Sequence, residues 1–173
     1  DYEKAKKVLK KFKKDDDFYY WFRLKKEAQI ISAQRNNQES LNFIKFNFDK
    51  IENPNEKILF DVANFYKKAK NYEEAIRYYS KIIENLDDNS DIKSDILYRR
   101  GGTYERIKNY EKADKDLIDA LQITPDDAYI LNYLAYSWLE RDYKINEAIK
   151  MLETAYELES DDPYIIDLSL IHI

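Results

Sequence analysis

The side chains that carry out most enzymatic chemistry are scarce in this 173-residue chain. It contains no cysteine and a single histidine, His172. The absence of cysteine excludes disulfides, thiolate nucleophiles and zinc–thiolate sites. The combinations of catalytic residues that remain possible are pairs of carboxylates and a serine–lysine pair. Because the acidic residues fall on predicted helix faces and caps, with no deep apolar pocket implied, we expect a protein that is not an enzyme and needs no cofactor.

Two short segments contain residue types found in ligand-binding loops. The sequence DDNSD at 87–91 fits the opening of a calcium loop, but Ile92 stands where glycine is needed and Tyr98 where the bidentate glutamate should be. Gly101 and Gly102 are adjacent and lie inside a predicted helix, which excludes the Walker and dinucleotide-binding glycine patterns. We therefore expect neither a metal site nor a nucleotide site.

The composition favours long helices joined by short loops. Two glycines and three prolines cannot supply the many tight turns of a sandwich, a barrel or a doubly wound sheet. Apolar residues make up 44% of the chain and charged residues 36%, which is enough for a core and excludes a disordered chain. No apolar run approaches the roughly 20 residues that span a bilayer. We expect an all-α fold without a transmembrane segment.

An internal repeat organises the sequence. A small residue recurs inside one helix of each unit, at intervals of 35, 35, 38 and 35, in the set Ala5, Ser40, Ala75, Ala113 and Ala148. The preceding helix has its own small residue, four positions after a leucine and three before a large side chain, in the set Ala28, Ala63, Gly101 and Ala135. Small residues facing large ones allow two antiparallel helices to approach closely.

Residues 97–125 resemble the tetratricopeptide repeat, a helix–turn–helix unit of about 34 residues. The signature positions of that family are occupied here by Leu97, Gly101, Tyr104, Tyr110, Ala113, Leu117, Ala120 and Pro125. The resemblance covers nearly all of residues 1–167 and weakens at 18–52, where Ser40 replaces alanine. It implies an α-solenoid, a right-handed superhelix of antiparallel helix pairs, and the overall pattern is similar to bacterial members of the family that act as adaptors.

The repeat register divides residues 1–167 into one array of about four complete helix pairs with half-units at both ends. We expect a helix at 2–14, a further helix from about Asp162, and pairs at 18–34 with 38–52, 56–69 with 72–86, 92–107 with 110–122, and 127–141 with 145–158. Aspartates such as Asp88 and Asp127 precede helix starts, where carboxylates cap free N–H groups. Residues 168–173, LSLIHI, break the pattern and match the translation of a transposon-end sequencing adapter, so we interpret them as a non-native scar.

In the family that this chain resembles, the first helix of each pair lines a concave groove that receives an extended peptide or a helix. By spacing, that face here consists of Lys25, Gln29, Phe60, Asn64, Lys67, Tyr98, Arg99, Gly102, Glu105, Asn132, Tyr133 and Tyr136. Aromatic side chains provide contact area at low entropic cost, and amides can hydrogen-bond to a peptide backbone. The alternative is that Phe60, Tyr98 and Tyr133 only pack against neighbouring helices.

Members of the family that clamp the C-terminal carboxylate of heat-shock chaperones use lysine, asparagine and arginine on this face. Lys25, Asn64 and Arg99 fall on or near it. The positions where asparagine or a base is expected are occupied instead by Gln29, Asp61 and Asp95. The resemblance therefore implies a non-enzymatic scaffold or adaptor that binds a protein or peptide, without the chaperone clamp and without a small-molecule substrate.

Charge is uneven along the chain, although the net charge is only −5 and does not favour nucleic acid. Residues 1–14 carry seven lysines and two acids, whereas residues 151–167 carry six acids and no base. Two alternatives follow: binding of RNA or an anionic membrane surface through the basic N-terminal helix with Tyr2 and Phe12, or self-association through uncapped ends. The chain begins at Asp1 and its single methionine is Met151, so we expect residues before Asp1, and a cytoplasmic or an exported envelope location both fit.

Overall fold

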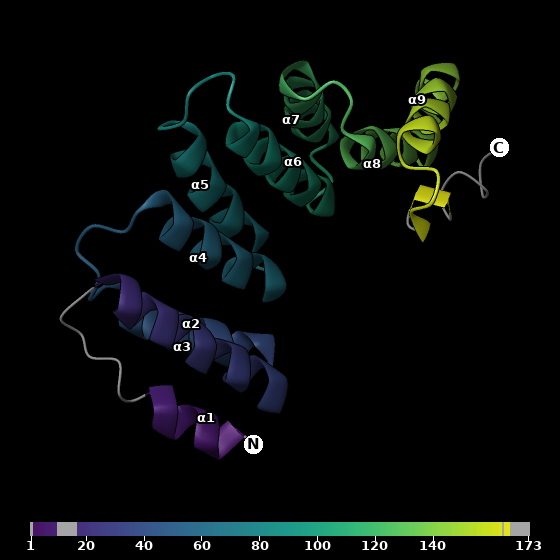
Figure 1. Ribbon diagram of the computed structural model, residues 1–173. Coiled ribbons are helices and arrows are strands. Elements are labelled where there is room, and N and C mark those ends of the chain that lie inside the picture. The colour runs from purple at the N-terminus through teal and green to yellow at the C-terminus, as the bar shows by residue number, and fades with distance from the viewer. Residues whose placement is uncertain (1, 10–16, 164, 167–173) are drawn as a thin grey trace. The chain divides into compact units, whose positions relative to one another are not determined.

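The computed structural model describes residues 2–9, 17–163 and 165–166, and the regular elements of this part of the chain are helices (Figure 1). They are α1 (Tyr2–Leu9), α2 (Asp17–Gln34), α3 (Asn37–Phe48), α4 (Glu56–Lys68), α5 (Tyr72–Ile83), α6 (Asp91–Arg106), α7 (Tyr110–Ile123), α8 (Ala128–Leu139) and α9 (Ile145–Leu158). Helical residues follow again from Pro163. The predicted all-α fold is confirmed. Residues 10–14 of the first expected helix, and the scar predicted at 168–173, lie outside the described residues.

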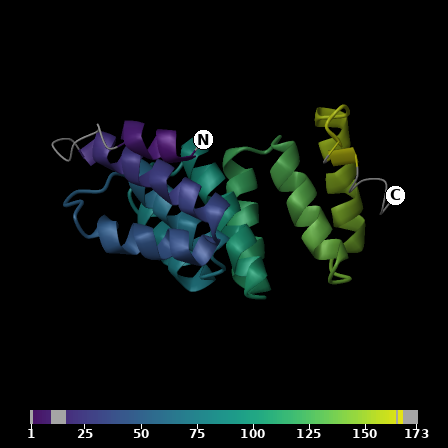
Figure 2. The ribbon, with the colours of Figure 1, turned by 90° about the horizontal axis from the view of Figure 1, so that it is seen from below.

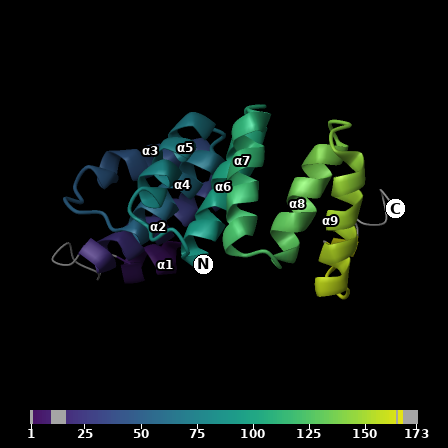
Figure 3. The same ribbon diagram turned by 90° about the horizontal axis from the view of Figure 1, so that it is seen from above.

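The helices form pairs within two compact units, residues 1–84 and residues 85–173. In the first unit α2 packs on α3 and α4 on α5, α3 also contacts α4, and α1 contacts α2. In the second unit α6 packs on α7 and α8 on α9, while α7 contacts α8. Figures 2 and 3 show α8 and α9 as antiparallel neighbours joined by a short turn. These pairs are the repeat units that the spacing of small residues predicts.

Small residues lie where the two helices of a pair meet. Ala28 and Ala63 on the first helices and Ala75 and Ala113 on the second are fully buried. Ser40 occupies the alanine position of the α2–α3 pair, and its Oγ donates a hydrogen bond to the Ala28 carbonyl oxygen at 2.7 Å. This bond satisfies the buried hydroxyl. The α2–α3 pair therefore keeps the close helix contact despite its weaker sequence signature.

Asparagine caps most of the helix starts whose capping bonds are seen. The side-chain oxygens of Asn36, Asn55 and Asn109 accept hydrogen bonds from backbone N–H groups in the first turns of α3, α4 and α7. Asp127 caps α8, as predicted. Asp88 does not cap α6, because the residue before that helix is Ser90; the Asp88 carboxylate instead accepts a hydrogen bond from Lys93 Nζ at 2.6 Å.

The turns inside the α4–α5, α6–α7 and α8–α9 pairs use left-handed residues that are not glycine. Lys70, Lys108 and Asp142 have φ angles of 61°, 59° and 52°. After each of them a backbone N–H reaches the carbonyl five residues earlier, as in Asn109 N to Tyr104 O at 2.9 Å. This is the 6→1 bond of a Schellman motif, which usually has glycine at the left-handed position. The α8–α9 turn is longer and has a second left-handed residue, Lys144.

Gly101 is required by the α6–α7 contact, and we expect Gly101→Ala to lower the stability of the second unit. A Cβ there would lie 3.1 Å from Leu117 Cγ and 3.2 Å from the Ala113 carbonyl oxygen, both fixed in the buried contact. The overpacking outweighs the helix propensity of alanine, for a net loss of about 1 kcal/mol. Gly102→Ala is the matched control, because its Cβ would meet only the phenol end of Tyr133. Equal urea midpoints for the two variants would contradict this prediction.

Lys108 stores backbone strain, and we expect Lys108→Gly to stabilise the protein by about 1 kcal/mol. The gain comes from relieving a positive φ angle at a residue that has a Cβ. Lys150→Gly, inside α9, makes the same chemical change in a helix and should destabilise by about 1 kcal/mol. Urea denaturation of both variants measures the two shifts, and shifts of the same sign would contradict the assignment.

Candidate binding surfaces

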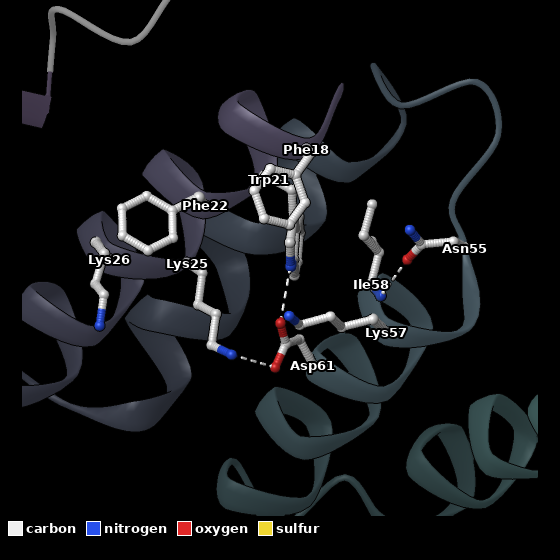
Figure 4. A pocket seen from close by; sticks show the side chains of 9 residues that line it. All are labelled: Phe18, Trp21, Phe22, Lys25, Lys26, Asn55, Lys57, Ile58 and Asp61. Atoms are coloured by element: carbon white, nitrogen blue, oxygen red, sulfur yellow. Dashed lines mark hydrogen bonds and ion pairs between the residues drawn. The ribbon is translucent and has the colours of Figure 1, made fainter. Parts of the chain in front are cut away.

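The first unit has a pocket between α2 and α4, shown in Figure 4. Its volume is about 170 Å³, and its lining residues are Phe18, Trp21, Phe22, Lys25, Lys26, Asn55, Lys57, Ile58 and Asp61. We call it the α2–α4 pocket. It combines aromatic and aliphatic walls with three lysines and one carboxylate.

Asp61 is the polar anchor of this pocket. Its carboxylate accepts a hydrogen bond from Trp21 Nε1 at 2.9 Å and forms an ion pair with Lys25 Nζ at 2.5 Å (Figure 4). Both Asp61 and Trp21 are buried. A buried carboxylate is tolerated when charge and hydrogen bonds compensate its lost hydration. The two contacts fix α2 against α4 and position the Lys25 side chain.

The rim of the pocket consists of two lysines above two exposed aromatic rings. Lys57 Nζ lies 5.7 Å from the centroid of the Phe18 ring, and Lys26 Nζ lies 5.7 Å from that of Phe22. The exposed fractions of Phe18 and Phe22 are 51% and 40%. Such cation–π pairs are weak at exposed sites. The rim therefore offers apolar area and positive charge to solvent at the same place.

The second unit has a tyrosine-rich surface on α6 and α8. The rings of Tyr98 and Tyr133 meet edge to face with centroids 5.5 Å apart, and the Tyr133 hydroxyl donates a hydrogen bond to Glu105. Gly102 leaves room for this phenol, which lies 3.2 Å from where a Cβ would be. Burial and the nearby Glu105 carboxylate raise the pKa of Tyr133 above its usual range. The hydroxyl therefore remains a proton donor at neutral pH. We call this group of four residues the α6–α8 tyrosine cluster.

The remaining predicted residues of the first unit have different environments. The Phe60 ring packs near that of Tyr79 with centroids 6.3 Å apart, and Asn64 Oδ1 accepts a hydrogen bond from the Tyr79 hydroxyl at 2.9 Å. Gln29 is exposed and accepts a hydrogen bond from Lys26 Nζ at 3.3 Å, whereas Lys67 is half-buried. These contacts hold Phe60 and Asn64 in place against α5.

In the second unit Arg99 forms an ion pair with Asp95, with Nε at 2.9 and 3.0 Å from the two carboxylate oxygens. Tyr136 is half-buried, and Asn132 is fully buried. Among the described residues, neither polar side-chain atom of Asn132 has a hydrogen-bond partner. The structure thus brings Tyr98, Gly102, Glu105 and Tyr133 into one cluster, while Asn132 does not reach the surface.

Sequence reasoning predicted Lys25 but missed its neighbours in the α2–α4 pocket. Phe18, Trp21 and Phe22 precede the leucine and alanine signature of α2, and they were not assigned to the face that binds partners. Lys57 precedes the signature leucine of α4 by two positions. The first turns of α2 contain more aromatic residues than a single buried stripe of a helix can hold. That surplus was the sequence signal for aromatic side chains at the surface.

Within the described part of the chain, no helix is long and apolar enough to cross a membrane. The same residues contain no group of three or more histidine, cysteine, aspartate or glutamate side chains placed to hold a metal ion.

Asp61 should matter for stability far more than its surface counterpart Asp95. We expect Asp61→Ala to cost about 1–3 kcal/mol, because the buried Trp21 Nε1 loses its acceptor. Asp95→Ala, which breaks an exposed pair between neighbouring turns, should cost about 0.5 kcal/mol or less. In a Trp21→Phe background the effect of Asp61→Ala should shrink. An unchanged effect in that background, measured by urea unfolding, would show that the indole bond is not responsible.

Comparison with known proteins agrees with the repeat register. Residues 56–85 and 94–127 match the tetratricopeptide repeat family. A 72-residue segment, 42% of the chain, is 33% identical to the TPR repeat-containing protein PA4667 of Pseudomonas aeruginosa. The chain spans only 12% of the length of that relative.

Solved structures share the fold at low sequence identity. MamA 41-end from Desulfovibrio magneticus RS-1 superposes with a TM-score of 0.66 and 18% identity, over 88% of this chain and 82% of that one. The first TPR of Spaghetti (RPAP3), bound to the HSP90 peptide SRMEEVD, superposes with a TM-score of 0.58 and 22% identity. The superposition covers 68% of this chain and 89% of that one. A chain of the APC/C hetero-tetramer Cut9-Hcn1 superposes with a TM-score of 0.69 and 13% identity, over 88% of this chain and 30% of that one. The two matched segments fall in the predicted register, and the described helices α2 to α9 pair as in these solenoid structures, so residues 56–85 and 94–127 are tetratricopeptide repeats within an α-solenoid fold.

Proposed function

We propose that this chain is a non-enzymatic interaction scaffold that binds a peptide or helix of a partner protein on the first helices of its pairs. The observation that carries the proposal is the α2–α4 pocket, where apolar walls and lysines are presented together at the surface. Pockets with mostly apolar walls and a few placed polar groups are the usual form of a binding site. Residues 1–167 form a single repeat array in this proposal.

The α6–α8 tyrosine cluster supports a second contact region in the other unit. Tyrosine and arginine are over-represented among the residues that contribute most to binding energy. The hydrogen bond from Tyr133 to Glu105 and the edge contact with Tyr98 restrict these side chains before any partner arrives. Side chains that are already ordered lose less entropy on binding. The cluster is therefore suited to recognition as well as to packing.

The structure of Spaghetti with an HSP90 peptide shows that a repeat array with the same fold can bind a short peptide. A carboxylate clamp of the chaperone type is not favoured here. Lys25 already pairs with Asp61, and Arg99 with Asp95. A ligand carboxylate would have to displace an internal one to reach either cation. We infer that the partner binds through a different set of contacts.

Peptide display on the immobilised chain tests the proposal. Selected peptides should bind in solution, and Tyr98→Ala with Arg99→Ala should weaken those that use the second unit by about tenfold. The matched control is Tyr156→Ala with Lys150→Ala, which removes an exposed tyrosine and a cation from α9, the second helix of its pair. The readout is fluorescence anisotropy, with circular dichroism to confirm that both variants are folded. If no peptide is enriched, or if the α9 variant has the larger effect on every selected peptide, the first-helix face is not the binding surface.

A further inference from the structure

We propose that the α2–α4 pocket recognises an acidic segment of a partner protein, with one apolar side chain in the pocket and side-chain carboxylates on its lysine rim. This inference rests on the proposed function, and it specifies the chemistry of the partner at one of the two surfaces.

The pocket has room for one apolar side chain. Its volume is about 170 Å³, and Phe18, Trp21, Phe22 and Ile58 form its apolar walls. Phe18 and Phe22 remain about half exposed, although both are large and apolar. Exposed apolar groups gathered around a hollow are typical of surfaces that become covered in a complex. A leucine or aromatic side chain inserted there would bury both phenylalanine rings.

The charge at the rim is positive after internal pairing is counted. Lys25, Lys26 and Lys57 line the pocket together with one acid, Asp61. Asp61 accepts a hydrogen bond from Trp21 and pairs with Lys25. Lys26 and Lys57 instead lie over aromatic rings. These four charged lining residues leave a net charge of +2, which favours an anionic ligand.

The spacing of the cations favours several carboxylates over one. Lys26 comes from α2 and Lys57 from α4, and Figure 4 shows them on different sides of the pocket. One terminal carboxylate would need cations that converge on a single point, but Lys25, the third lysine of the pocket, already holds Asp61. An extended segment with acidic side chains on both sides of an apolar residue would reach Lys26 and Lys57 separately. The ligand carboxylates are therefore those of side chains within the peptide.

The probe for this proposal is a labelled peptide with blocked termini that has two glutamates on each side of a central leucine. Binding is measured by fluorescence anisotropy. Two control peptides replace all glutamates by glutamine, or the leucine by serine. We expect each control peptide to bind about tenfold more weakly, because it lacks either the charge or the inserted side chain.

The same unit contains a closely matched control for the rim. Lys50 Nζ lies 4.5 Å from the centroid of the exposed Phe46 ring, at the same four-residue spacing as Lys26 and Phe22, but outside the pocket. Phe22→Ala with Lys26→Ala should weaken binding of the probe about tenfold, whereas Phe46→Ala with Lys50→Ala should change it less than about twofold. All four residues are exposed, so both variants should fold, which circular dichroism verifies.

Several outcomes would overturn the inference. Equal effects of the two double variants would show that the pocket is not the binding site. Tighter binding of the same peptide with a free C-terminal carboxylate would indicate a terminal clamp instead. Loss of self-association, or loss of binding to vesicles of anionic lipid, in the Phe22 and Lys26 variant alone would assign the pocket to a second copy or to a membrane. If display yields peptides that require Tyr98 and Arg99 but the acidic probe does not bind, the proposed function stands and this inference fails.

Discussion

The close approach of two helices at small residues is the constraint on which the rest of this structure depends. Ala63 against α5 and Gly101 against α7 allow backbones to come near enough for large side chains to fill the remaining groove. Where alanine is missing, Ser40 restores the contact by bonding to the Ala28 carbonyl. Because each pair buries one face only by stacking on its neighbour, stability is shared between pairs.

Buried ion pairs add specificity to these contacts. Arg100 binds the two carboxylate oxygens of Asp116 at 2.7 and 2.8 Å, joining α6 to α7 inside the second unit. Asp61 joins α2 to α4 in the first unit through Trp21 and Lys25. Such pairs offset the cost of burying charge more than they add net stability. Their geometric demands favour one register of the helices, which in turn fixes where the surface side chains lie.

The helix pairs were predictable because small and large residues recur with a regular period, and such a period indicates the buried face of a helix. Several turn details were not. Lys70 and Lys108 adopt left-handed conformations that no propensity assigns to lysine, and asparagines rather than most of the aspartates cap the helices. The α2–α4 pocket escaped prediction for another reason. Trp21 and Asp61 are 40 residues apart, and only stacking of α2 on the neighbouring pair brings them within hydrogen-bond distance.

Surface chemistry differs between the two units because it resides in side chains that the repeat does not specify. At the position directly after the signature leucine of each first helix, the chain has Lys25, Phe60, Tyr98 and Asn132. Lys25 and Tyr98 belong to the polar and aromatic surfaces, Phe60 packs on Tyr79, and Asn132 is buried. The same repeat position is therefore buried in one pair and partly exposed in another. The repeat fold determines which helix faces lie at the surface, and the individual side chains determine the charge and shape of those faces.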